Sequence, residues 1–258
     1  MKRISLLRLG MLCLACVSCV LALGQNNIVV VQSRHVSQEN IEAFEYRETT
    51  YWKVVAEKAI SEGKLFDWSF WRRVDGFDLH QGHNYIFVNT FTPEQFRSYS
   101  EDDSIWDYKR TFPKARMKDI DTFGLSEVRD QLYYQNLYYV ESSPPKYLRV
   151  NFADASDLQT YAKLEPEIWG PFITKQMDNG TTSVVSWGFS QLIIPRGRDM
   201  PHNAVSVDGF ATLADALGRS FTSDVEIPED VSKLFEVHDK SEVHIYRLVA
   251  RADKEAAP

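Results

Sequence analysis

The chain has 258 residues, of which 44% are hydrophobic, 13% aromatic and 25% charged. Its 36 acidic residues outnumber the 29 basic ones, which gives a formal net charge of −7. This excess of acidic residues disfavours binding to nucleic acid or anionic membranes, because contacts to phosphate need clustered Lys and Arg. We therefore expect no nucleic acid among the partners.

The first 24 residues have the pattern of a secretory signal peptide. A basic start precedes an uncharged run of 15 residues, Leu9–Leu23, and small residues at 22 and 24 form a cleavage motif. We predict cleavage after Gly24, a secreted or periplasmic protein, and no membrane span after cleavage. A retained anchor is one alternative, although a span needs roughly 20 apolar residues. A lipoprotein is another, although Cys16 and Cys19 lack an aliphatic residue at −3.

All three cysteines lie in this segment, so the mature chain has none. Disulfides, a thiol nucleophile and Cys-ligated metal centres are thereby excluded from it. The remaining 258 − 24 = 234 residues carry a charge of 26 − 36 = −10, because the signal removes three basic residues. We predict a soluble protein, since this part contains no second long apolar run.

The first half of the mature chain predicts the element order β-α-β-β-α-β. Short β-branched or alternating runs indicate strands, a 3.6-residue apolar period that stops at Gly63 indicates a helix, and Pro93 suits the first turn of another. The expected elements are a strand at 27–35, a helix at 39–62, strands at 64–74 and 84–91, a helix from 92 and a strand at 130–141.

The second half predicts the same order. Its long helix contains two prolines, Pro166 and Pro171, at which we expect it to be interrupted. The expected elements are a strand at 146–153, a helix at 157–179, strands at 182–194 and 203–212, a helical stretch at 213–219 and a strand at 242–252.

Residue spacing also indicates a duplication, because a fixed internal period is typical of repeated units. The matching residues are Trp52 and Trp169, Gly63 and Gly180 (both 117 apart), and His83-Asn84 and His202-Asn203 (119 apart). The sequence "ESSPPK" at 141–146 marks a linker. We predict repeats at 25–143 and 144–258.

Two such units resemble a tandem, single-chain member of the dimeric α+β barrel superfamily. That group includes antibiotic-biosynthesis monooxygenase-like, EthD-like, NIPSNAP-like and chlorite-dismutase-like proteins. The resemblance implies an α+β fold of two ferredoxin-like units, whose four-stranded sheets face each other as a barrel with helices outside. A single sheet with helices on one face leaves its other face wet, and a second copy covers it. The charged segments 106–123 and 223–240 are either surface decoration or lids over a pocket.

The aromatic residues suggest a pocket for a flat or apolar ligand, with core packing as the alternative. The strand "DWSFW" carries rings on both faces, and "YYQNLYY" at 133–139 suits a strand at the seam between the copies. The candidate ligand-binding residues are Trp52, Trp71, His83, Tyr85, Trp169, Trp187 and His202.

Among the histidines, His35 ends the first strand and is our candidate general base. His80 and His83 with Asp78 could hold a metal, but no further ligand is identifiable and we predict no metal site. His238 and His244 have no evident partners. The first copy has more ionisable groups around its hairpin, so we expect a site there first.

No dinucleotide-binding, P-loop, nucleophile-elbow or haem-attachment motif is present. The resemblance to chlorite-dismutase-like proteins implies noncovalent haem bound by a histidine of the second copy, but no residue matches that ligand, and we predict no cofactor. The sequence therefore predicts an exported protein that binds a small aromatic or apolar molecule, with cofactor-independent acid–base or oxygen chemistry if it is an enzyme. A non-catalytic envelope scaffold and a haem protein stay open, as does the oligomeric state.

Overall fold

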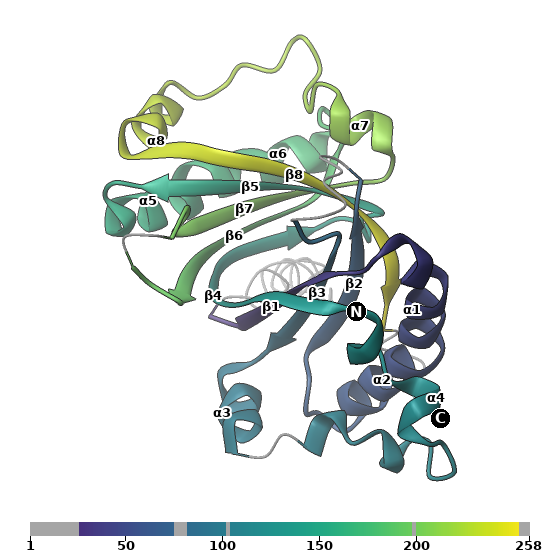
Figure 1. The fold of residues 1–258 in the computed structure, drawn as a ribbon. Helices are drawn as coiled ribbons and strands as arrows, with labels where there is room; N and C mark the ends of the chain where they lie inside the picture. Colours follow the sequence, from purple (N-terminus) through teal and green to yellow (C-terminus); the bar gives the residue numbers. More distant parts are fainter. Residues whose placement is uncertain (1–25, 75–81, 102–103, 198–199, 253–258) are drawn as a thin grey trace, which may run out of the picture.

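A computed structural model describes residues 26–74, 82–101, 104–197 and 200–252. The predicted signal peptide lies outside the described residues. Eight antiparallel strands close into a barrel in the order β1-β3-β2-β8-β5-β7-β6-β4 (Figure 1). The strands are β1 (Ile28–His35), β2 (Asp67–Arg73), β3 (Tyr85–Phe91), β4 (Glu127–Glu141), β5 (Tyr147–Ala155), β6 (Val184–Ile194), β7 (Ala204–Phe210) and β8 (His238–Arg251).

The barrel consists of two equivalent four-stranded sheets. The first half of the chain forms β4-β1-β3-β2 and the second forms β8-β5-β7-β6, so the predicted pair of ferredoxin-like units is confirmed. β4 and β8 are longer than expected because each pairs first within its own sheet and then with the other sheet, through β4–β6 and β2–β8. Residues 133–141 pair with β6, which confirms the seam predicted for "YYQNLYY".

The two repeats also share a local hydrogen-bond motif. Asn84 accepts from the backbone N–H of Val36 (2.9 Å) and donates to its carbonyl (2.8 Å). Asn203 does the same with Ala155, at 2.9 Å for both bonds. Each pair fixes the start of the third strand of its repeat against the end of the first strand. The His-Asn spacing in the sequence therefore marks equivalent positions.

A long helix covers the outer face of each sheet (Figure 1). The first consists of α1 (Ile41–Arg47), a π-helical turn at Glu48–Trp52, and α2 (Lys53–Ser61). The second consists of α5 (Leu158–Leu164), a π-helical turn at Glu165–Trp169, and α6 (Gly170–Asn179). The expected interruption of the second helix occurs at Pro166, which lies in its π turn, and Pro171 lies in the first turn of α6. The first repeat has the same π turn without a proline, so the irregularity belongs to both repeats.

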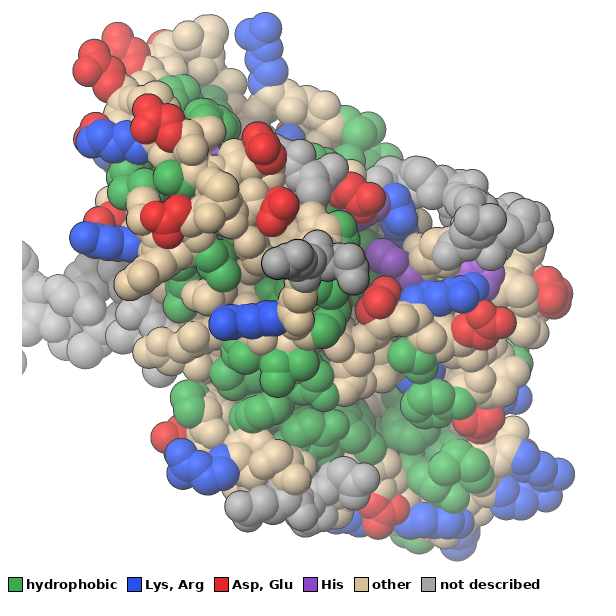
Figure 2. All heavy atoms as spheres, turned by 60° about the vertical axis from the view of Figure 1, so that its left-hand side comes forward, with side chains coloured by type: hydrophobic (Ala, Val, Ile, Leu, Met, Phe, Trp, Pro, Cys, Tyr) green, Lys and Arg blue, Asp and Glu red, His purple; other side chains and the backbone are tan. Residues whose placement is uncertain are grey.

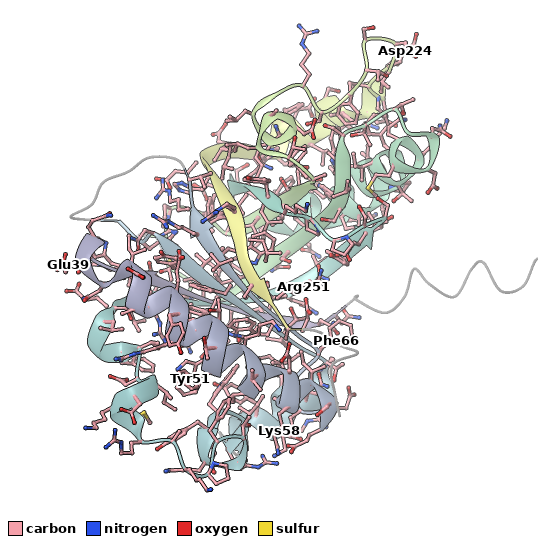
Figure 3. All side chains as sticks on the ribbon, turned by 90° about the vertical axis from the view of Figure 1, so that its right-hand side faces the viewer. Glu39, Tyr51, Lys58, Phe66, Asp224 and Arg251 are labelled. Carbon is pink, nitrogen blue, oxygen red and sulfur yellow. The ribbon has the colours of Figure 1, made fainter. Side chains whose placement is uncertain are left out.

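Shorter helices occupy the connections. They are α3 (Pro93–Glu101), α4 (Met117–Ile120), α7 (Leu213–Leu217) and α8 (Ser232–Val237). In Figure 3 the helix that carries Tyr51 and Lys58 lies on the outside of the first repeat, and Asp224 lies in the loop that leads to α8 at the far end of the second. No helix among the described residues is both long and apolar enough to cross a membrane.

Apolar side chains form three clusters, one inside the barrel and one between each sheet and its helices. The barrel interior contains Trp71, Tyr134, Leu148, Leu192 and Tyr246. The cluster of the first repeat is centred on Phe44, Phe70 and Phe87, and that of the second on Tyr161, Trp187 and Phe189. At the seam, Arg251 at the end of β8 forms ion pairs with Asp67 (3.0 Å) and Glu141 (3.4 Å) of the first repeat (Figure 3).

Candidate ligand-binding site

A cavity of about 430 Å³ lies between the sheet and the helices of the second repeat, and we call it the repeat-2 pocket. Its floor comes from β5, β6 and β7, one wall comes from α5 and the π turn, and its cover comes from the segment around α8. The lining includes Arg149, Asn151, Tyr161, Glu165, Trp169, Trp187, Ser206, Asp208, Phe221, Leu234 and His238.

Small residues on β7 leave this space open. The equivalent strand of the first repeat places Tyr85 and Phe87 against its helix, where both are buried. The residues 119 positions later are Ala204 and Ser206. The backbone register is the same in both repeats. Ser206 lines the repeat-2 pocket where the first repeat has the ring of Phe87, while Ala204 is buried in the apolar cluster beside it.

One wall of the repeat-2 pocket is polar. Arg149 donates to Asp208 (Nε to Oδ2, 3.1 Å) and to the hydroxyl of Ser220 (2.6 Å). Asn151 donates to the same Asp208 oxygen at 3.2 Å, and both Asn151 and Asp208 are buried. These hydrogen bonds hold the polar atoms in fixed positions, as is typical of sites that orient a ligand.

The opposite wall carries groups that can move protons. The hydroxyl of Tyr161 donates to Oε1 of Glu165 at 2.7 Å, and the ring of His238 stacks on Tyr161 with 4.3 Å between centroids. Nδ1 of His238 contacts the carbonyl of Leu234 at 2.5 Å. A carbonyl only accepts, so Nδ1 carries the proton. Burial and the neighbouring Glu165 raise the pKa of Tyr161, which keeps its hydroxyl protonated.

Aromatic rings complete the enclosure. Trp169 lies at the end of the π turn, and its ring meets Phe221 edge-on at 6.0 Å. Trp187 on β6 is fully buried and packs at 5.4 Å from Tyr138 of β4. Two of the predicted ligand-binding residues, Trp169 and Trp187, therefore line the same cavity.

The predicted residues of the first repeat lie in a packed core. The indole N–H of Trp52 donates to the carbonyl of Ile120 at 2.9 Å. Tyr85 donates to Glu45 (2.7 Å) and stacks on Phe70 at 5.2 Å. We expected a site in this copy first, but these two side chains serve as packing and anchoring groups in the described structure.

The first repeat contains a buried ion pair, whereas the second keeps only the equivalent glutamate, Glu165, and has Ala153 in place of the arginine. The guanidinium of Arg34 lies 3.9 Å from Glu48 and donates to the hydroxyls of Thr122 and Ser126, both at 3.3 Å. Burial raises the pKa of Glu48 to about 7, although Arg34 opposes the shift. These polar side chains join β1 and the π turn of the first repeat to the segment before β4.

The remaining predicted residues lie in the barrel interior. His83 contacts the hydroxyl of Tyr246 (2.7 Å), and His202 contacts that of Tyr134 (2.8 Å), so each pair joins one repeat to the last strand of the other. Trp71 is also inside, with its N–H donating to Ser69 at 2.7 Å. The candidate ligand-binding residues are thus distributed over three places.

His35 lies outside these pockets. Its Nδ1 bonds to the carbonyl of Gly82 at 2.8 Å, which ties the end of β1 to a residue shortly before β3. The role of His35 as a general base stays a prediction. Asp78 and His80, the other residues of the metal alternative, lie outside the described residues. Within the described part of the chain, no group of three His, Cys, Asp or Glu side chains could hold a metal ion.

The sequence interpretation missed the polar lining of the repeat-2 pocket. Glu165 was detectable, since Glu48 precedes it by the 117 residues that separate the paired tryptophans. His238 seemed partnerless, but the structure stacks it on Tyr161. That contact joins β8 to a helix 77 residues earlier, and no local pattern reveals it.

No protein-family model and no curated protein matches the sequence. Among solved structures, a "putative monooxygenase" from Fusobacterium nucleatum is similar, with a TM-score of 0.56, 9% identity, and coverage of 89% of this chain and 95% of that one. A second, from Lactobacillus acidophilus, has a TM-score of 0.52, 11% identity and coverage of 89% and 97%. An anthrone oxidase-like protein has a TM-score of 0.52, 13% identity and coverage of 93% and 99%.

The chain has the dimeric α+β barrel fold in its single-chain, tandem form. At these identities the likeness concerns the fold alone, and function has to be argued from the site.

Proposed function

We propose that this protein binds a small, largely aromatic or apolar molecule in the repeat-2 pocket. The observation that carries the proposal is the cavity of about 430 Å³, which falls within the roughly 300–1,000 Å³ typical of ligand sites. A scaffold that only made protein contacts would have no need to keep Ser206 in the lining of a cavity where its duplicate has Phe87.

The lining supports a specific orientation for the ligand. Its flat apolar part packs between Trp169, Trp187 and Phe221, while a hydroxyl or carbonyl group faces Tyr161 and Glu165. The Glu165 carboxylate, already bonded to the hydroxyl of Tyr161, accepts a proton from an acidic ligand hydroxyl. This is the place where an acid–base step would occur if the protein is an enzyme.

Two structural features favour this ligand class over haem. The cavity is near the lower end of the range for ligand sites, and the Arg149–Asp208 pair lies at its floor and is already satisfied. Export from the cytoplasm, which the N-terminal pattern predicts, is part of the same proposal.

A fluorescence titration with 1-naphthol, a planar phenol, tests the proposal, because Trp169 and Trp187 would report its binding. We expect saturable quenching, and we expect Ser206→Phe, which inserts the ring of the first repeat, to weaken binding at least tenfold. Ser98→Phe, on the exposed face of α3, is the matched control and should leave binding unchanged. Equal binding by both variants, or no quenching of the unaltered protein, contradicts the proposal. A Soret band after haem addition would replace it with a haem protein.

A further inference from the structure

Two exposed segments of the surface carry opposite charge. The basic segment, residues 109–118, has the sequence "KRTFPKARMK", with five basic residues and no acidic one. The acidic segment, residues 224–230, has the sequence "DVEIPED", with four acidic residues and no basic one. All of these charged side chains are exposed. The two segments are therefore complementary in charge, as the two sides of a protein interface are.

The segments occupy equivalent places in the two repeats but lie at opposite ends of the molecule. Each belongs to the connection between a short helix and the last strand of its repeat, α3 to β4 in the first and α7 to β8 in the second. The ammonium group of Lys58 donates to the carbonyl of Arg110 at 3.1 Å, so Lys58 marks the basic segment. Figure 3 shows Lys58 and Asp224 at opposite ends, so the two segments of one molecule do not meet each other.

The basic segment has two ammonium groups available to a partner. Lys114 and Lys118 are exposed, and neither forms an ion pair with another residue that the structure describes. Met117 lies between them in the sequence and is 49% exposed. The ion pairs that the segment already forms are those of Arg110 with Glu62 and of Arg116 with Asp119.

The acidic segment repeats this arrangement with the opposite sign. Glu226 and Glu229 are exposed and form no ion pair within the described part of the chain, and Ile227 between them is 47% exposed. Asp230 is already paired with Lys233. Figure 2 shows acidic side chains gathered beside apolar ones at the end that the second repeat forms, and basic side chains around the opposite end. Each end thus presents two charges of one sign around an exposed apolar side chain.

We propose that copies of this protein associate head to tail, with the acidic segment of one copy docked on the basic segment of the next. The two carboxylates meet the two ammonium groups around an apolar contact between Ile227 and Met117. Every copy has both surfaces in equal number, so a second copy is the partner that the charges favour. Exposed ion pairs contribute little each, so the charges mainly decide which ends meet. Because the two contacting surfaces differ, association continues beyond two copies into a ring or a filament.

Sedimentation velocity of the purified protein tests whether copies associate. In about 20 mM NaCl we expect the weight-average mass to rise above that of the monomer as the protein concentration increases from about 1 to 200 µM. We expect about 500 mM NaCl to weaken association at least tenfold, because salt screens exposed charges. A monomer at every concentration in low salt, or association that salt does not change, overturns the proposal.

Charge reversal in two double variants locates the interface. One combines Lys114→Glu with Lys118→Glu, and the other combines Glu226→Lys with Glu229→Lys. Each variant alone has like charges at both contact positions and should stay monomeric over the same range of concentration. An equimolar mixture should associate within about threefold of the unaltered protein, because the ends of one variant then complement those of the other. Association of either variant alone, or a mixture that stays monomeric, refutes the interface.

A matched control separates this contact from an effect of total charge. Lys146→Glu combined with Lys175→Glu changes the net charge as much as reversing Lys114 and Lys118 does, at exposed positions outside both segments. This variant should associate like the unaltered protein. Loss of association in this control as well would show that overall repulsion decides the result, and the proposal would fail.

Discussion

The outer cores of the two repeats have the same backbone but different contents. In the first, Phe70 stacks on Phe87 at 4.7 Å and on Tyr85 at 5.2 Å, and all three rings are buried. In the second, Ser206 stands at the position of Phe87 and lines a cavity. The two copies of the fold thus differ in the contents of their outer cores, with stacked rings in the first and a cavity in the second.

The segments that cover the outer cores, before β4 in the first repeat and before β8 in the second, also make different contacts. In the first repeat, Trp52 and Arg34 bind the segment before β4 through its backbone and hydroxyl groups. In the second, Ala153 stands in place of Arg34, and the segment before β8 contributes apolar residues such as Leu234 to the pocket. Hydrogen bonds therefore fix the covering segment of the first repeat, whereas that of the second presents apolar side chains to the pocket.

Alanine substitution at the equivalent positions 87 and 206 should therefore lower stability by different amounts. Phe87→Ala removes a buried stacked ring and should lower the free energy of unfolding by about 3–5 kcal/mol. Ser206→Ala, at the equivalent position, should cost less than about 1 kcal/mol. Denaturant unfolding measures both values. Similar losses for the two variants would show that the cores are equally packed and would remove the contrast.

The buried carboxylate of the first repeat should give stability a pH dependence. Burial raises the pKa of Glu48 from 4.5 to about 7, so the native state holds its proton more tightly than the unfolded chain does. The stability that it contributes is complete below about pH 4.5 and is lost as the pH rises through 7. The loss amounts to about 3 kcal/mol.

Glu48→Gln cannot ionise, so it should remove this part of the pH dependence. The test is the difference in unfolding free energy between the two proteins from pH 4 to 8. A difference that stays constant over this range would mean that the pKa of Glu48 is the same in the folded and the unfolded protein.

Equivalent substitutions in the barrel interior should lower stability by similar amounts in the two repeats, in contrast with the outer cores. Tyr134→Phe and Tyr246→Phe each remove the hydroxyl that contacts a histidine, at 2.8 Å for His202 and 2.7 Å for His83. Each should cost about 1 kcal/mol. Thermal or chemical unfolding of both variants checks this. Losses that differ by more than about 2 kcal/mol would indicate that the two pairs are not equivalent.

The sequence was sufficient for the fold because its signals are local and repeated. The Trp52–Trp169 and Asn84–Asn203 spacings identify equivalent positions, and alternating apolar residues identify strands. The π turns were not visible, since Pro166 suggests a break in only one copy. The full length of β4 and β8 was also missed, because their first residues pair with strands of their own sheet and are not apolar enough to show a clear alternation.

The site was harder to predict because it depends on what is missing from one copy. Trp169 and Trp187 were found by their size, but Trp52 and Trp71 share their residue type and lie in other places. The informative signal is the exchange of Phe87 for Ser206, which becomes meaningful only when the strands are aligned in space.

A crystal structure of the protein soaked with 1-naphthol tests the central claim most directly, which is that the second repeat is the open one. We expect density for the ring between Trp169 and Trp187 and none around Phe87 of the first repeat. A ligand found in the first repeat, or a second repeat whose side chains have closed the cavity, would contradict the account.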